Sequence, residues 1–93
     1  MNKMANVIIK LKIMPESLDI DLEELKGKIE KALEKAGSVK INLIEVEEIA
    51  FGLKALIITL AWPENLDTEK AENAAKIPGV SSVEVIDYRR AFG

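Results

Sequence analysis

Residues 53–62 read Leu-Lys-Ala-Leu-Ile-Ile-Thr-Leu-Ala-Trp, and this stretch decides the fold. Its run from Ala55 to Ile58 is apolar without interruption, which is typical of a central strand covered on both faces. Pro63 follows at once and has no N–H to donate to a ladder, so the strand is expected to end there. The rest of the chain should therefore be arranged around this strand.

Three further strands are indicated by alternation of apolar and polar side chains with a period of two. The alternation occurs over residues 7–14, 39–47 and 80–88. Met14-Pro15 ends the first of these segments, again because proline disfavours further pairing. Four strands are thus expected.

Two helices separate these strands. The first is capped by Asp19 or Asp21, which precede acidic residues suited to a first turn, and it stops at Gly37. A shorter, alanine-faced helix is predicted over residues 67–76. The apolar side chains that recur at helical spacing in the first helix are Leu22, Leu25, Ile29, Ala32 and Leu33.

The element order β-α-β-β-α-β predicts an α+β fold, the ferredoxin-like sandwich, with two helices on one face of a four-stranded antiparallel sheet. Residues 1–93 are expected to form a single domain. The spatial strand order in this fold is 4-1-3-2. We expect the first and third strands to run one way and the second and fourth the other.

Composition excludes several classes of protein. The chain has no Cys and no His, which rules out thiol nucleophiles, imidazole bases and zinc sites of the Cys/His type. Its five glycines are isolated, so we expect no phosphate-cradling loop and no nucleotide bound by this chain. The paired carboxylates are suited to solvated faces and helix caps. We therefore expect no covalent catalysis, no metal and no cofactor.

A net charge of -3 makes this chain a poor candidate for binding nucleic acid, which depends on neutralising phosphates. Only Trp62 and Tyr88 are strand aromatics, and both lie near strand ends, which disfavours base stacking on the sheet. The apolar segment 7–14 is interrupted by Lys and is too short to span a membrane. A cytoplasmic location is expected.

Two segments suggest a site. Ile49-Ala50-Phe51-Gly52-Leu53 places apolar residues at a connection, where side chains usually face water. Either Phe51 folds back onto the core or it is offered to a partner. Arg89-Arg90 are the only arginines in the chain, and they are either a solvated basic tail or a second contact.

The expected strand directions put the connection after the second strand and the end of the fourth strand at one end of the sheet. Phe51 and Arg89-Arg90 should then lie roughly 10–15 Å apart, which is three strand spacings. An apolar anchor beside two planar cations has the composition of a protein-interaction hot spot and does not resemble an enzyme site.

Three segments resemble the archaeal elongation factor 1-beta family. They are Lys12-Ile13-Met14-Pro15-Glu16-Ser17 with Asp21-Leu22, the central Glu48-Ile49-Ala50-Phe51-Gly52-Leu53-Lys54-Ala55-Leu56, and Val80-Ser81-Ser82-Val83-Glu84-Val85 with Asp87-Tyr88-Arg89-Arg90. They occur in the family's order and cover essentially the whole chain. The resemblance implies a ferredoxin-like fold, in agreement with the pattern of strands and helices.

The resemblance also implies a function, which is to promote exchange of GDP for GTP on the GTPase elongation factor 1-alpha during protein synthesis. It implies that Phe51 contacts the GTPase. We expect Gly52 and Lys54, which lie beside Phe51 in the sequence, to belong to the same contact, and Lys54, Arg89 or Arg90 to act on charges near the magnesium ion of the GTPase. In eukaryotic relatives a Lys near the C-terminus disturbs the magnesium and phosphate site of the GTPase. Arg90 aligns nearest to that Lys, with Arg89 adjacent, so this chain departs from the family in having Arg there.

Two alternatives remain open from the residues. One is a ferredoxin-like ligand-sensing regulatory module that works as an oligomer through its sheet edges. The other is acyl-phosphate hydrolysis, which would need a phosphate-cradling loop with an Arg after the first strand. Pro15-Glu16-Ser17 is acidic at that place, which argues against the hydrolase.

Overall fold

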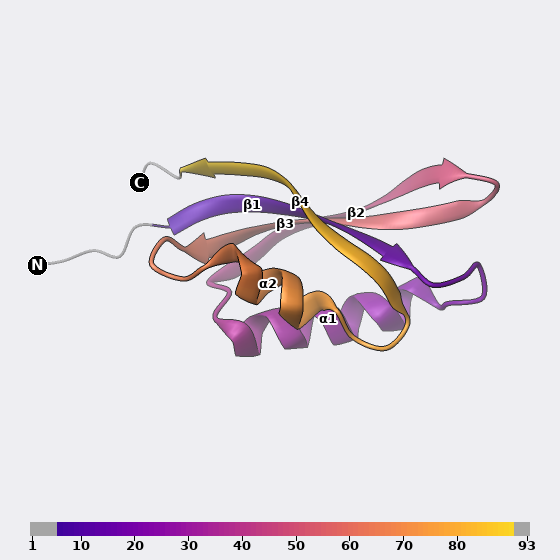
Figure 1. Ribbon diagram of the computed structural model, residues 1–93, viewed down its shortest axis with the longest axis horizontal. Coiled ribbons are helices and arrows are strands. Elements are labelled where there is room, and N and C mark those ends of the chain that lie inside the picture. The colour runs from indigo at the N-terminus through magenta and orange to yellow at the C-terminus, as the bar shows by residue number, and fades with distance from the viewer. Residues whose placement is uncertain (1–5, 91–93) are drawn as a thin grey trace, which may run out of the picture.

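The computed structural model describes residues 6–90 and shows the expected order of four strands and two helices (Figure 1). The antiparallel sheet has the strand order β2-β3-β1-β4, and both helices lie on one of its faces, which is the ferredoxin-like arrangement. The elements are β1 (Asn6–Pro15), α1 (Leu22–Ala36), β2 (Lys40–Ala50), β3 (Leu53–Pro63), α2 (Thr68–Ala75) and β4 (Val80–Arg90).

The directions of the strands correct one expectation. β1 pairs antiparallel with both β3 and β4, and β2 pairs antiparallel with β3. Hence β1 and β2 run one way and β3 and β4 the other, so the prediction that the first and third strands share a direction was wrong. In Figure 1 the β2–β3 connection accordingly lies at the right end of the molecule, whereas β4 ends at the left.

The core lies between the helices and the covered face of the sheet. Ala55 to Ile58 in β3 are all buried, as expected of a central strand. Val83 and Val85 of β4 face this core, whereas Ser82 and Glu84 are exposed. The largest fully buried side chains are Trp62, Ile9, Leu11, Ile13, Ile29, Leu33, Leu56, Ile58, Leu60 and Val7.

Local chemistry fixes both ends of α1. Asp21, and not Asp19, is the N-cap, and its carboxylate accepts from the backbone N–H groups of Glu23 and Glu24 at 3.0 and 3.4 Å. Gly37 ends the helix at a φ of 127°, where its N–H donates to the carbonyl of Leu33 at 3.1 Å. α1 packs on the covered face of the sheet, and the β1–α1 loop that leads into it lies at the β2–β3 end of the molecule (Figure 1).

Candidate functional site

The β2–β3 connection is a two-residue hairpin turn. Ala50 pairs with Leu53, and the two residues between them, Phe51 and Gly52, have φ angles of 53° and 81°. Positive φ at both central positions defines a type I′ turn, which favours Asn-Gly because few side chains tolerate this conformation. β2 therefore runs three residues beyond the predicted end at Glu47, because the turn extends the pairing to its last residue.

Phe51 occupies the unfavourable position of this turn with its side chain in solvent. It is 99% exposed, so the reading in which Phe51 folds back onto the core was wrong. A left-handed backbone costs an L-residue roughly 1–2 kcal/mol, and packing of the ring against residues 6–90 does not offset that cost. Phe51 is thus an apolar group held away from the protein surface, which is the arrangement of an anchor for a partner.

A groove lies beside Phe51, between the hairpin and the β1–α1 loop. We call it the tip groove; it has a volume of about 390 Å³. Leu18, which sequence reasoning missed, is 64% exposed at this groove and approaches the hairpin within 4.0 Å of an ideal Cβ at Gly52. The lining residues fall into apolar ones, Pro15, Leu18, Ile20, Leu22, Gly52 and Leu53, and polar ones, Ser17, Asp21, Glu23 and Lys54.

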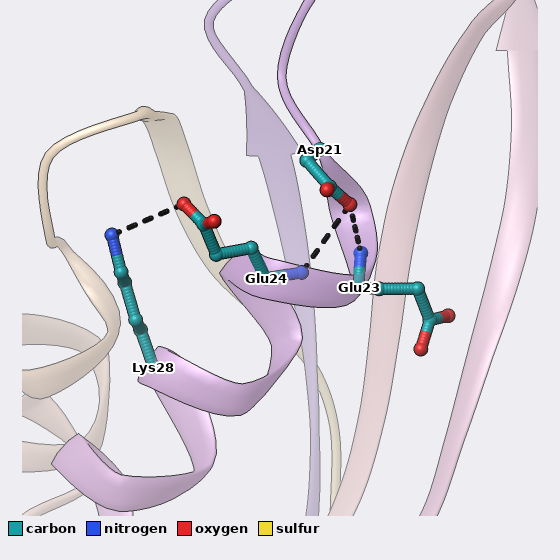
Figure 2. Close-up of polar contacts among 4 residues, drawn as sticks. All are labelled: Asp21, Glu23, Glu24 and Lys28. Carbon is teal, nitrogen blue, oxygen red and sulfur yellow. Dashed lines mark hydrogen bonds and ion pairs between the residues drawn. The ribbon is translucent and has the colours of Figure 1, made fainter.

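The first turn of α1 presents carboxylates on two sides of its axis. Figure 2 shows Asp21 turned back onto the helix, with Glu23 and Glu24 pointing in opposite directions. Glu24 is paired with Lys28 at 3.4 Å, and it lines a second hollow between this loop and Gly79. Glu23 lines the tip groove, and its carboxylate lies 3.5 Å from the ammonium of Lys26.

Charge is distributed unevenly along the molecule. Residues 16–24 and 45–54, which form the loop and the hairpin at this end, hold eight of the sixteen acidic residues and one Lys. Their net charge is therefore -7, although the whole chain carries only -3. An acidic field thus surrounds the exposed apolar side chains of Phe51 and Leu18.

Arg89 and Arg90 lie at the opposite end of the sheet. Arg90 is paired with Val7, and Val7 with Trp62, which is nine residues along β3 from Leu53 at the hairpin. That offset corresponds to about 30 Å of strand. The expectation that Phe51 and the arginines lie roughly 10–15 Å apart was wrong, because it rested on the wrong strand directions.

Each arginine already has an acidic partner in this chain. The Nε of Arg89 lies 3.0 Å from a carboxylate oxygen of Asp87, and Arg90 contacts the carboxylate of Glu64. Arg89 is opposite Ile8 and Arg90 opposite the buried Val7, so the two side chains emerge on opposite faces of β4. Both side chains are largely exposed, so these ion pairs are weak and can be exchanged for others.

The strand aromatics differ in their surroundings. Trp62 is fully buried, and its indole N–H donates to the carbonyl of Leu66 at 3.2 Å. Tyr88 is about half-exposed near the end of β4. Neither helix of residues 6–90 has the length and apolarity needed to cross a membrane.

Residues 8–90 match the family model described as the EF-1 guanine nucleotide exchange domain. The chain is also similar to proteins named elongation factor 1-beta from archaea. It is 49% identical to the one from Methanosarcina barkeri over 89 residues, which cover 94% of this chain and 99% of that protein. It is 48% identical to the one from Staphylothermus marinus over 85 residues, which cover 88% and 92% of the two chains.

Proposed function

Because this chain belongs to the family of EF-1 guanine nucleotide exchange domains and thus serves nucleotide exchange in translation elongation, we propose that its substrate is elongation factor 1-alpha, on which it acts without covalent chemistry. Residues 1–93 act as one exchange domain in the cytoplasm. The chain itself binds neither nucleotide, nucleic acid nor membrane. The observation that carries the proposal is the family match over residues 8–90, together with the fully exposed Phe51.

Exchange of this kind is a matter of linked binding. A GTPase holds its nucleotide through backbone amides, a Lys and a bound magnesium ion. A partner that prefers the nucleotide-free form weakens nucleotide binding, and nucleotide weakens the partner by the same factor. No bond is formed or broken on this chain, so an absence of Cys and His is no obstacle to the activity.

We assign the main contact to the turn. Phe51 supplies apolar burial, Gly52 permits the turn that projects it, and Lys54 brings a cation to the same surface. Interface energy is typically concentrated in a few aromatic and Arg side chains. The strain at Phe51 supports this assignment, because the fold alone gives no reason to keep a large apolar residue there.

A second contact is assigned to Arg89 and Arg90. Their guanidinium groups suit carboxylates and phosphates, and their present acceptors, Asp87 and Glu64, are exchangeable. Since this end lies about 30 Å from the hairpin, the GTPase must contact the exchange factor at two separate surfaces. Arg90, the nearer match to the family's Lys, would act on charges near the magnesium ion.

Substoichiometric amounts of this protein are expected to accelerate release of labelled GDP from elongation factor 1-alpha. With excess GTP present as the incoming nucleotide, the rate of GDP release should rise with the concentration of this protein. Calorimetry with GTP and the isolated chain serves as the control and should show no binding. A rate of GDP release that stays constant over a wide range of concentrations of this protein would contradict the proposed function.

The double substitution Arg89→Ala with Arg90→Ala is expected to lower exchange by about tenfold, through loss of charge-assisted hydrogen bonds. The matched control is Lys28→Ala with Lys31→Ala, which removes two exposed cations from α1 and should leave exchange near its normal rate. Equal exchange rates in the two double variants would show that the arginines only form a solvated end of β4 and do not contact the GTPase. The hairpin would then be the only candidate contact.

A further inference from the structure

Of the residues that line the tip groove beside Phe51, the proposed contact uses only Gly52 and Lys54. Its walls come from the β1–α1 loop, the start of α1 and the start of β3, so segments far apart in the sequence meet there. Leu18, Leu22 and Leu53 provide apolar walls, and Glu23 provides a carboxylate at the rim. Such a lining matches a side chain with an apolar stem and a charged end.

Glu23 is the carboxylate available to such a side chain. The carboxylate of Asp21 already caps α1 by accepting two backbone N–H groups. Within residues 6–90 Glu23 is paired with Lys26 at 3.5 Å, and the Glu23 side chain is 84% exposed, so this pair contributes little and is readily exchanged. Lys54 is a cation in the same lining, but a second cation entering between Leu18 and Leu53 would meet Glu23 within a loop and hairpin whose net charge, Lys54 included, is -7.

The same charge argues against other occupants. A second copy of this chain packed tip to tip across a two-fold axis would bring its own acidic tip to the groove, and like charges brought together at an interface cost several kcal/mol. A nucleotide or nucleic-acid phosphate would be repelled for the same reason. The occupant that fits is a positively charged protein surface.

Resting on the proposed function, we infer that the tip groove receives a Lys or Arg side chain from a basic patch on elongation factor 1-alpha. Insertion is reciprocal: Phe51 enters the GTPase while the cationic side chain enters the groove. The stem of that side chain packs on Leu18 and Leu53, and its charged head pairs with Glu23. Leu18 and Glu23 thereby join Phe51 in determining which partner is bound.

The test is the affinity of this protein for nucleotide-free elongation factor 1-alpha between about 0.01 M and about 1 M salt, over which the Debye length falls from about 30 Å to about 3 Å. The variants are Leu18→Ser, Glu23→Gln and Glu23→Lys. The matched control is Glu34→Lys, which makes the same charge reversal at an exposed position near the other end of α1. Thermal melting of each variant corrects for any loss of folded protein.

Leu18→Ser and Glu23→Lys are each expected to weaken binding about tenfold at low salt. Glu23→Gln should have a smaller effect and should flatten the salt dependence relative to the parent chain. If Glu23→Lys and Glu34→Lys bind equally well and Leu18→Ser is unchanged, the groove has no such occupant. A dimer of this chain that Leu18→Ser disrupts would also overturn the inference.

These results are separable from those that test the proposed function. If the parent chain fails to accelerate GDP release at all, the proposed partner is wrong. If the parent chain is active and the groove variants behave like Glu34→Lys, the partner is right and the groove inference alone fails.

Discussion

Phe51→Asn is expected to abolish most of the exchange activity and at the same time to stabilise the fold. Loss of a central aromatic anchor commonly costs about 2 kcal/mol or more of binding, which corresponds to roughly a 30-fold fall in kcat/KM for exchange. Asn followed by Gly52 is the preferred pair for a type I′ turn, so relief of the backbone strain should raise the free energy of unfolding by up to about 1 kcal/mol. Exchange kinetics and denaturant unfolding measure the two effects separately.

Two further variants sharpen this result. Phe51→Ala removes the ring, but Ala disfavours positive φ as Phe does. Exchange should therefore fall as far as in Phe51→Asn, while the unfolding free energy stays near that of the parent chain. Val39→Asn changes another exposed apolar residue, just before β2 at the far end of the sheet, and should leave exchange intact. A Phe51→Asn variant that melts well below the parent chain and exchanges normally per folded molecule would show that the ring stabilises the fold.

The largest loss of stability is expected from Trp62→Ala. Trp62 is fully buried, and deletion of a buried Trp or Phe side chain typically costs about 3–5 kcal/mol through lost burial and the cavity left behind. The substitution also leaves the carbonyl of Leu66 without its indole donor. Against a total stability of about 5–15 kcal/mol for a domain, this is a large fraction. Denaturant titration followed by circular dichroism measures it.

Tyr88→Ala is the matched control for that experiment. Tyr88 is also a strand aromatic, on β4 and directly opposite Ile9 of β1, but it is about half-exposed. Its loss should change the unfolding free energy by about 1 kcal/mol or less. If the two substitutions destabilise the protein equally, burial in the core does not govern the contribution of Trp62 to stability.

Much of the fold could be predicted from local patterns. Alternation of apolar and polar residues located three of the strands, and the uninterrupted run Ala55 to Ile58 located the fourth and identified it as central, because burial on both faces disfavours polar positions. The choice between Asp19 and Asp21 as N-cap needed the backbone conformation, since both residues are Asp and the residue type alone does not distinguish them.

The direction of the strands could have been obtained by stricter reasoning. In the order 4-1-3-2, an antiparallel sheet requires the first and third strands to oppose each other, because they are neighbours. The prediction overlooked this requirement and therefore placed Arg89 and Arg90 at the wrong end of the sheet. The distance of these arginines from Phe51 depends on how β1 pairs with β3 and β4, which no single segment of the sequence encodes.

By itself, the sequence determined the order of elements, the apolar faces of the strands and of the first helix, and the unusual placing of Phe51 before Gly52, because these depend on neighbours along the chain. Only the tertiary structure decided that Phe51 points into solvent and that Leu18 and Glu23 line a groove beside it. An apolar residue at a turn has the same local pattern whether it is buried or exposed. Its exposure depends on where the turn lies relative to the β1–α1 loop and α1, which is a property of contacts between distant segments.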